Sequence, residues 1–386
     1  DRIVVLYNGE VKESGPTEEI INNPRHPYTK RLMAAIKPLP EPGQGTLSSD
    51  EHLRNDPALE VKAVDAGYGM MPNGEPAIKI LRDVNLAIER GKTVGIIGES
   101  GCGKSTLARV MAGLLPASAG EIFLDGEELS YALSARDKDQ LRRVQFVYQM
   151  ADTALNPRQQ IKEILGRPIE FYTGRSGRAR RSRVEELLQL VDLPKQFADR
   201  YPHELSGGQK QRVNLARALA AEPEIVLCDE VTSALDTIVG ANVIDLLTRL
   251  QRETGVSFVF ISHDLSTVAS FADEIVVLYA GRVAEQGTAD QVLSAPYHPY
   301  TRLLISSVPE LRTGWLEEAS SSRAAQSGLA GGVQLTKVGC PFFERCADAI
   351  KGTCDMQDPP RRTSADKHTI ECHLDHSLLS EPLSRH

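Results

Sequence analysis

A glycine-rich loop between a strand and a helix constrains the fold of this chain more than any other feature. Thr93–Ile97 has the pattern of a buried strand, Gly98–Thr106 follows as Gly-Glu-Ser-Gly-Cys-Gly-Lys-Ser-Thr, and Leu107–Leu114 continues as a helix. Glycines allow backbone N–H groups to wrap around phosphates, and a helix N-terminus adds a favourable dipole. This strand–loop–helix context is the one that a P-loop requires, so the sequence predicts an α/β nucleotide-binding core.

The side chains of this loop form the first set of candidate contacts. Lys104 is expected to lie on the β- and γ-phosphates of a nucleotide, and the hydroxyl of Ser105 is expected to ligate Mg²⁺. A generic glycine-rich turn rarely supplies a Lys-Ser pair at this spacing, so the nucleotide interpretation is preferred. The predicted cofactor contacts in the loop are Gly98, Glu99, Ser100, Gly101, Cys102, Gly103, Lys104, Ser105 and Thr106.

Two further strands place polar side chains at the same edge of the predicted sheet. Glu224–Glu230 reads as a buried strand ending in two acids, of which Asp229 is placed to hold Mg²⁺ and Glu230 to activate water as a general base. The alternative is a strand followed by a solvated acidic turn. Ser257–His263 ends in a histidine that is interpreted as a sensor of the γ-phosphate, although a histidine at a strand end is more often used for packing or capping.

Length and composition limit the class of protein. The chain has 386 residues, enough for two or three domains, and it is 41% hydrophobic and 25% charged, as is usual for soluble globular proteins. It contains no apolar run long enough to span a membrane and no start that resembles a signal peptide. The net charge of −8 disfavours a protein that coats nucleic acid or an anionic membrane. We therefore expect a cytosolic protein with no nucleic-acid partner.

An internal repeat connects the two parts of the chain. Residues 1–36 align with residues 273–308 without a gap, at an offset of 273 − 1 = 272 and with 16 identities in 36 positions. A repeat of this kind indicates a duplicated unit. We therefore expect the chain to be the C-terminal part of a longer tandem protein that contains a first domain of the same type. The alternative, a chance likeness of composition, is disfavoured by the matched His-Pro-Tyr-Thr at 26–29 and 298–301.

With the segment Leu205–Gln209, of sequence Leu-Ser-Gly-Gly-Gln, the residues resemble the ATP-binding subunits of ABC transporters. The resemblance covers Leu59–Leu311 and the N-terminal repeat. It implies a P-loop NTPase fold with a RecA-like core, an antiparallel β subdomain and a helical subdomain that carries this signature sequence. It also implies that ATP closes two such domains against each other and that hydrolysis releases them. The residues expected to cap the γ-phosphate on the partner domain are Ser206, Gly207, Gly208 and Gln209.

The resemblance assigns further positions of the nucleotide site. Gln149, which follows a short apolar strand, matches the glutamine that couples Mg²⁺ and water to the membrane partner. The predicted Mg²⁺ contacts are therefore Ser105, Gln149 and Asp229, and the predicted catalytic residues are Lys104, Gln149, Glu230 and His263. Tyr68 matches the aromatic side chain that stacks on adenine, with an ordinary strand tyrosine as the alternative.

Three features resemble the oligopeptide/dipeptide branch of importers, which also handles nickel and opines. They are Asn156-Pro157-Arg158, the repeated His-Pro-Tyr-Thr and the terminal cysteines. This branch implies a subunit at the cytoplasmic face of the bacterial inner membrane, with two transmembrane permease subunits and, indirectly, a periplasmic or extracellular solute-binding protein. The sequence does not identify the cargo.

Two other functions compete with this interpretation. A soluble tandem ATPase of the same fold that acts on ribosomes or nucleic acid is disfavoured by the three features above. A scaffold that binds ATP without turnover is disfavoured because Lys104, Asp229, Glu230 and His263 are all intact.

Four cysteines gather near the end of the chain. Cys340, Cys346, Cys354 and Cys372 follow the spacing C-x5-C-x7-C-x17-C, which lacks the paired C-x2-C of zinc ribbons. The resemblance implies that they bind a 4Fe-4S cluster of structural role. A zinc ion, with His373 as a substitute ligand, and four reduced structural cysteines are the alternatives. Because the segment is polar, we expect a metal to replace the core that it cannot build.

Composition suggests the boundaries of the units. We expect residues 1–37 as the tail of a preceding ATPase domain, 38–57 as a linker, 58–311 as the ATPase domain, 312–332 as a second linker and 333–386 as a cysteine-rich extension. An arginine run at 174–183 is interpreted as a solvated helix face, with Glu185 and Glu186 as its partners, in preference to a nucleic-acid patch.

Overall fold

The computed structural model describes residues 2–40, 57–71, 75–311, 314–315, 338–375 and 377–379. The predicted linkers at 38–57 and 312–332 therefore lie almost entirely outside the described residues. Within the described ranges, every helix is too short or too polar to cross a bilayer.

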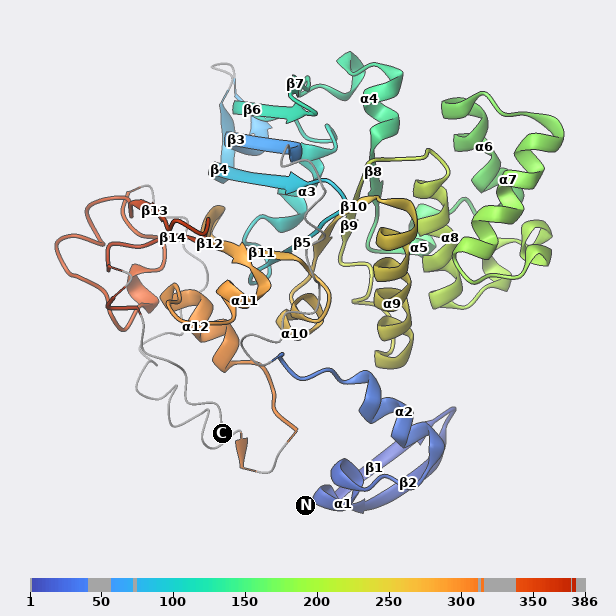
Figure 1. The fold of residues 1–386 in the computed structure, drawn as a ribbon, viewed down its shortest axis with the longest axis horizontal. Helices are drawn as coiled ribbons and strands as arrows, with labels where there is room; N and C mark the ends of the chain where they lie inside the picture. The colour runs from blue at the N-terminus through green and yellow to red at the C-terminus, as the bar shows by residue number, and fades with distance from the viewer. Residues whose placement is uncertain are drawn as a thin grey trace.

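A large mixed sheet forms the centre of the molecule (Figure 1). Among the described residues its order is β13-β14-β12-β11-β5-β10-β9-β8, and the five strands from β11 to β8 run parallel. Every residue of β5, β9 and β10 is buried, as expected for parallel strands covered on both faces. The parallel strands are β5 Thr93–Ile97, β8 Val144–Val147, β9 Ile225–Asp229, β10 Ser257–Ile261 and β11 Glu274–Tyr279. The antiparallel strands are β12 Arg282–Thr288, β13 Arg361–Thr363 and β14 Thr369–Glu371.

Helices pack around this sheet and follow its strands in the order of an α/β fold. The P-loop helix starts at Lys104 directly after β5, and the longest helix, α9, precedes β10. The helices of this part are α3 Lys104–Met111, α4 Lys138–Arg143, α9 Thr237–Thr254, α10 Leu265–Ala269, α11 Ala289–Val292 and α12 Pro299–Ser306, with a short 3₁₀ turn η1 at Leu133–Ala135.

A second, antiparallel sheet covers the P-loop helix. Its order is β4-β3-β6-β7, and Leu59, Leu81 and Leu107 join it to α3 in one buried cluster. The predicted antiparallel β subdomain is therefore present. Its strands are β3 Pro57–Met70, β4 Pro76–Glu89, β6 Ala119–Leu124 and β7 Glu127–Glu128.

A helical lobe lies at the far side of β8, on the right of Figure 1. Most of the predicted arginine run falls on α7, where Arg180 is exposed and Arg183 is half-buried. Arg180 pairs with Glu170 and Arg183 with Glu186, whereas Glu185, the other predicted partner, pairs with Lys195. The solvated-face interpretation is confirmed. The elements of the lobe are α5 Ala151–Ala154, α6 Ile161–Pro168, the π-helical turn η2 Ile169–Thr173, α7 Gly177–Leu190, the 3₁₀ turns η3 Lys195–Asp199 and η4 Pro202–Glu204, and α8 Gly207–Leu219.

The C-terminal extension is integrated into the large sheet. β14 pairs antiparallel with the edge strand β12, through Glu285 with Ile370 and Gln286 with Thr369, and β13 pairs with β14. Phe342, just before the 3₁₀ turn η5 Phe343–Arg345, is buried in the main core cluster. The expectation of a segment without access to a core is therefore wrong, because the extension shares the core of the ATPase domain.

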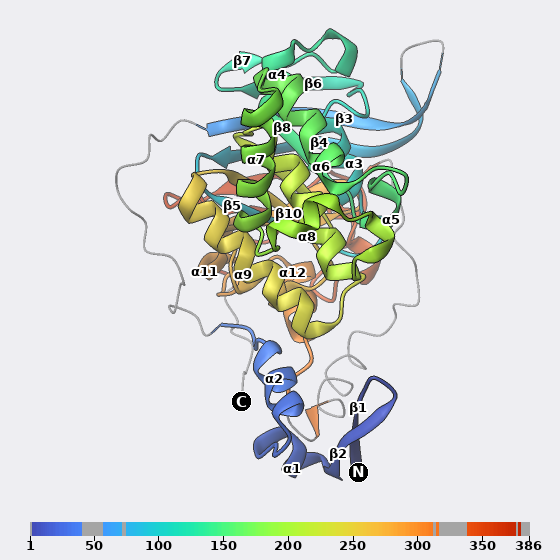
Figure 2. The same cartoon turned by 90° about the vertical axis from the view of Figure 1, so that its right-hand side faces the viewer.

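The N-terminal repeat forms a small lobe below α9 (Figures 1 and 2). It consists of β1 Arg2–Tyr7, β2 Glu10–Pro16, α1 Thr17–Asn22 and α2 Pro27–Ala35. Its register breaks between Val5 and Leu6, at the same place where β11 breaks between Val277 and Leu278. The two repeats therefore share their fold down to a single irregularity.

Candidate nucleotide site

The P-loop backbone requires glycine at defined positions. Gly98 and Gly103 have φ values of +152° and +109°, in the region that side chains disfavour. A Cβ on Gly98 would lie 2.2 Å from the carbonyl oxygen of Leu278, so the loop packs against the end of β11 with no room for a side chain. The sequence pattern thus corresponds to a specific backbone shape.

Lys104 folds back over this loop. Its Nζ donates to the carbonyl oxygens of Gly98 at 2.8 Å and of Glu99 at 3.0 Å, and the residue is buried. The neighbouring thiol of Cys102 is also buried, and burial raises its pKa. The loop therefore holds one buried cation, whose side chain is fixed by backbone carbonyls at the start of α3.

Two oxygen groups meet where α3 begins and β9 ends. The hydroxyl of Ser105, at the start of α3, donates to Oδ1 of Asp229, at the end of β9, over 2.8 Å. Burial raises the pKa of Asp229 above its ordinary value because it disfavours the charged carboxylate. Carboxylate and hydroxyl oxygens suit Mg²⁺, so this pair fits the predicted metal.

A second group of side chains surrounds Glu230. Nε2 of Gln149 donates to Oε2 of Glu230 at 2.9 Å and to the hydroxyl of Ser233 at 3.1 Å, and Nδ1 of His263 lies 3.6 Å from Oε1 of Glu230. Glu230 has a φ of +48°, which is rare for a residue with a side chain and is typical of functional sites. Strand ends far apart in the sequence thus bring three predicted residues into contact.

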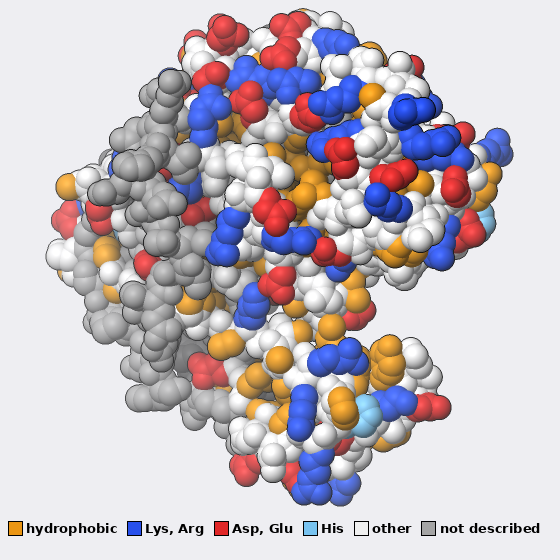
Figure 3. Space-filling model, turned by 45° about the vertical axis from the view of Figure 1, so that its right-hand side comes forward, with side chains coloured by type: hydrophobic (Ala, Val, Ile, Leu, Met, Phe, Trp, Pro, Cys, Tyr) orange, Lys and Arg blue, Asp and Glu red, His pale blue; other side chains and the backbone are white. Residues whose placement is uncertain are grey.

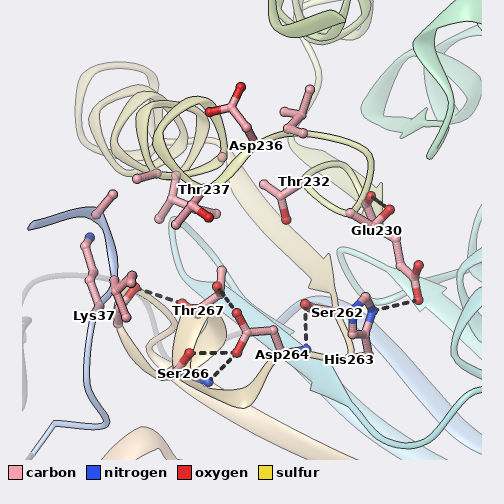
Figure 4. Close-up of a pocket in the computed structure, with 18 residues that line it drawn as sticks. Lys37, Glu230, Thr232, Asp236, Thr237, Ser262, His263, Asp264, Ser266 and Thr267 are labelled. Carbon is pink, nitrogen blue, oxygen red and sulfur yellow. Dashed lines mark hydrogen bonds and ion pairs between the residues drawn. The ribbon is translucent and has the colours of Figure 1, made fainter. Parts of the chain in front are cut away.

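A pocket opens beside this group (Figure 4). Glu230 and His263 lie on one side of it, Asp236 and Thr237 contribute from the start of α9, and Lys37 reaches it from the segment after the N-terminal repeat. Lys37 also lies 3.5 Å from Asp245 of α9. Sequence reasoning did not connect the N-terminal segment with this site.

Tyr68 lies at the edge of the P-loop helix. Its hydroxyl is 3.3 Å from the hydroxyl of Thr106 and accepts from Nη1 of Arg109 at 3.3 Å, and the side chain is half-exposed. An exposed tyrosine beside the P-loop helix is compatible with both interpretations of this residue, a stacking partner and an ordinary strand tyrosine.

The signature segment caps a helix, as expected. The Ser206 hydroxyl accepts from N–H of Gln209 at 3.4 Å, and Oε1 of Gln209 accepts from N–H of Ser206 at 2.9 Å, at the start of α8. A Cβ on Gly208 would lie 2.4 Å from a methyl group of Val239, so glycine lets α8 approach α9. Within the described parts of the chain, no hydrogen bond or ion pair joins Ser206–Gln209 to the P-loop of the same chain.

The four C-terminal cysteines line one small cavity next to α12. Cys340, Cys346, Cys354 and Cys372 all contribute to its wall and all are free thiols. Burial raises the pKa of Cys340 to about 11 and that of Cys346 to about 12. Among the described residues, no three histidine, cysteine or acidic side chains are grouped so that they could hold a single metal ion. The cysteines are thus brought together, but the predicted metal site is not confirmed.

Sequence reasoning missed one contact of the P-loop. Glu99 is bound by Arg345 of the C-terminal extension and by Tyr300 of α12. The only signal for this contact was the repeated His-Pro-Tyr-Thr, which marks Tyr300 but gives no partner.

Comparison with protein families supports this architecture. Residues 81–233 match the family model described as ABC transporter. The model described as oligopeptide/dipeptide transporter, C-terminal region, matches residues 12–61 and 284–354. These two ranges start 284 − 12 = 272 residues apart, the same offset as the internal repeat.

Several relatives match over most of their length. A Brucella abortus protein with a peptide-import name is 42% identical over 315 residues, which cover 80% of this chain and 91% of the relative. The dipeptide transport ATP-binding protein DppF of Escherichia coli is 40% identical over 316 residues, 81% of this chain and 93% of DppF. The glutathione import ATP-binding protein GsiA of Shigella flexneri is 36% identical over 333 residues, 80% of this chain but 53% of GsiA.

Solved structures agree on the fold. A dimeric structure of the ATP-binding cassette MJ0796, bound to ADP and Pi, has a TM-score of 0.52 and 36% identity, covering 60% of this chain and 98% of the cassette. The cbiO1 subunit from Clostridium perfringens has a TM-score of 0.56 and 26% identity, covering 68% of this chain and 100% of cbiO1. The chain therefore belongs to the ABC transporter ATPases, the ATP-hydrolysing subunits of these transporters, in the group that carries the oligopeptide/dipeptide C-terminal region.

Proposed function

We propose that this chain drives an importer for peptides or related small solutes by binding and hydrolysing ATP. The observation that carries the ATPase part is the meeting of the Ser105–Asp229 pair and the Glu230 group at one edge of the sheet. The peptide part rests on the names of the relatives, DppF for dipeptide transport and GsiA for glutathione import. No feature of the described residues favours a ribosome- or nucleic-acid-associated ATPase.

Each residue of the site has a proposed role. Lys104 binds the β- and γ-phosphates within the loop Gly98–Thr106, and Tyr68 stacks on adenine. Ser105 and Asp229 would hold Mg²⁺, which would neutralise charge on the phosphates, and Gln149, which contacts Glu230, would reach the ion from that side. Glu230 takes a proton from the attacking water, and His263, which faces it, holds the γ-phosphate in line.

A second ATPase domain completes the site in this proposal. The capped segment Ser206–Gln209 presents backbone N–H groups at a helix start, where they can bind a phosphate held by another P-loop. ATP would then close two domains and hydrolysis would release them. We propose that the partner is a first ATPase domain of a longer chain. This idea is supported by the second match of the C-terminal family model at residues 12–61 and by the half-length match to GsiA.

The remaining partners follow from the importer assignment. We propose that the ATPase is a peripheral protein at the cytoplasmic face of the bacterial inner membrane. It would dock there on two transmembrane permease subunits, which receive cargo from a solute-binding protein on the other side. The names of the dipeptide and glutathione relatives support this arrangement.

We also propose that Cys340, Cys346, Cys354 and Cys372 ligate a structural 4Fe-4S cluster, with zinc as the alternative. The support is their shared cavity, because four cysteine thiolates are the usual ligands of such a cluster. Anaerobic analysis that finds about four iron and four sulfide per chain supports the cluster. One zinc supports the alternative, and a chain without either metal overturns both.

The main proposal is tested with Glu230→Gln. We expect this variant to bind ATP and to associate with its partner domain but to lose hydrolysis, because the amide cannot accept the proton of water. Glu186→Gln on α7, whose carboxylate pairs with Arg183 on the surface, is the matched control and keeps full activity. Unchanged hydrolysis in Glu230→Gln would contradict the assignment of the base. Uptake of a labelled dipeptide by cells that express the complete transporter tests the substrate class separately.

A further inference from the structure

The C-terminal extension reaches back to the P-loop through a single arginine. Arg345 ends the turn η5, directly before Cys346, and its guanidinium binds the carboxylate of Glu99 at two points. The distances are 2.8 Å from Nη1 to Oε2 and 2.7 Å from Nη2 to Oε1. The Arg345 side chain is 17% exposed and that of Glu99 is 34% exposed. A two-point guanidinium–carboxylate pair fixes the orientation of both groups, unlike a single contact.

Glu99 is also held through its backbone. Its N–H donates to the hydroxyl of Tyr300 at 2.9 Å, and Tyr300 is fully buried on α12. The ring of Tyr300 packs on that of Phe342, with centroids 5.5 Å apart, and Phe342 is in the extension. The side chain and the backbone of one P-loop residue are thus fixed by the C-terminal extension and by α12, respectively.

The contact continues to the P-loop lysine. The carbonyl of Glu99 accepts from Nζ of Lys104 at 3.0 Å, so the residue that Arg345 orients is also a partner of Lys104. The pKa of Arg345 is raised, mainly because it donates to Glu99, so the guanidinium stays charged. The extension is therefore connected to Lys104 through the Arg345–Glu99 ion pair and the carbonyl of Glu99.

We propose that Arg345 and Tyr300 are positioning residues for the P-loop, and that the C-terminal extension thereby sets the affinity for ATP at this site. Neither residue touches the nucleotide in this proposal; both act through Glu99. The inference goes beyond the proposed importer function, because it concerns the ATP site whatever the cargo is. An extension that merely anchored the fold would change stability but would leave the ATP kinetics unchanged.

The first test compares Arg345→Ala with Arg302→Ala in the purified chain. Arg302 of α12 pairs with Asp348 of the same extension at 2.6 Å but does not contact the P-loop. We expect Arg345→Ala to weaken ATP binding, measured by calorimetry with Mg²⁺, by about fivefold or more, a typical size for coupling between sites. Arg302→Ala should bind ATP as the wild type does. Equal affinities in the two variants, at equal melting temperatures, overturn the proposal.

Graded and double variants show whether Glu99 carries the effect. Arg345→Lys should fall between the wild type and Arg345→Ala, because an ammonium replaces only part of a two-point contact. Glu99→Gln should weaken ATP binding by itself, and adding Arg345→Ala to it should cost little more, since residues that act through one contact are not additive.

The single variant Glu99→Gln also protects the test against misfolding. If Arg345→Ala does not fold, Glu99→Gln decides the question, because its substitution changes one charged group at the surface of the loop. Wild-type affinity for ATP in Glu99→Gln overturns the proposal. Full additivity of Glu99→Gln and Arg345→Ala does the same, because Arg345 would then act by another route.

Discussion

The two repeats have the same local structure and very different surroundings. In the first repeat the Nδ1 of His26 accepts from N–H of Tyr28 at 3.1 Å, and in the second the Nδ1 of His298 accepts from N–H of Tyr300 at 3.0 Å. The ring pairs also correspond, with centroid distances of 4.4 Å for Tyr7 and Tyr28 and of 4.5 Å for Tyr279 and Tyr300. Short-range hydrogen bonds and ring contacts are thus set by the repeated sequence itself.

Burial separates the two repeats. Val4 and Leu6 are 52% and 60% exposed, while Val276 and Leu278 at the equivalent positions are 3% and 0% exposed. Figure 3 shows apolar side chains among charged ones on the small lobe formed by the first repeat. β11 is covered because it pairs with β5 of the large sheet, whereas β1 pairs only with β2 among the described strands. The same sequence pattern thus forms an exposed strand in the first repeat and a buried strand in the second, depending on the strands that pair with it.

The largest effect should come from truncating the equivalent leucines. Leu278→Ala removes a fully buried side chain and should lower the free energy of unfolding by about 2–5 kcal/mol. Leu6→Ala should lower it by less than about 0.5 kcal/mol, because most of its side chain already faces water. Urea unfolding followed by circular dichroism measures both. Similar losses in the two variants would mean that β1 is buried against an element that the structure does not show.

The glutamate that contacts each His-Pro-Tyr-Thr segment allows a second comparison of the two repeats. Glu285 is fully buried and accepts from N–H of His298 at 2.8 Å, and it lies 2.8 Å from Nε2 of His368. Glu285→Ala should cost about 2 kcal/mol of unfolding free energy, because buried donors lose their acceptor. Glu13→Ala, at the half-buried equivalent position, should cost about half as much. Thermal melting tests this order, and a reversed order would contradict it.

Acid should destabilise the second repeat through His298. Burial lowers the pKa of His298 to about 4, from 6.5 for the free side chain. The unfolded chain therefore binds more protons between these values, so the stability contributed by neutral His298 is complete above pH 6.5 and is lost as the pH falls toward 4. Between pH 6.5 and 5 the loss should be about 1.5 kcal/mol. In His298→Asn this part of the pH dependence should disappear; its persistence would point to another titrating group.

The smallest effect is expected for ATP binding, when the hydroxyl of Tyr300 or of the equivalent Tyr28 is removed. Tyr300→Phe removes the acceptor for N–H of Glu99 in the P-loop and should weaken ATP binding by roughly threefold, the size of one net hydrogen bond. Tyr28→Phe keeps the ring contact with Tyr7 and should leave ATP binding unchanged. Titration with ATP and Mg²⁺ measures both, and equal affinities in the two variants would remove Tyr300 from the positioning role.

Sequence reasoning succeeded where short segments carry their own geometry. The P-loop glycines, the strand end at Asp229 and the capped Ser206 were located from local patterns, because backbone shape and helix capping depend on neighbours in the chain. The strand predicted to end at His263 ends at Ile261. The positions of the buried parallel strands could be expected because such strands leave continuous apolar runs.

Sequence reasoning failed where interacting residues are far apart in the chain and where strands are too short to show a periodic pattern. β13 and β14 have three residues each, too few for a recognisable period, and the pairing of β14 with β12 joins segments more than 70 residues apart. Glu99 and Arg345 are 246 positions apart in the sequence, and no sequence pattern around either residue indicates the other as its partner. The cavity of the four cysteines was anticipated from spacing, but the grouping needed for a single metal ion is not found in the described residues.

The pairing of β14 with β12 has a consequence for how the protein behaves in a test tube. An open strand edge invites other chains to add to it and thus promotes aggregation, and lysines on such an edge oppose this. β2 has Lys12 where β12 has the buried Ala284, so the exposed repeat carries a charge that the covered one lacks. Trimming the chain before β13 would therefore expose the backbone edge of β12 where Glu285 and Gln286 now pair with β14. The trimmed chain would then self-associate, and an activity assay would record this as loss of function.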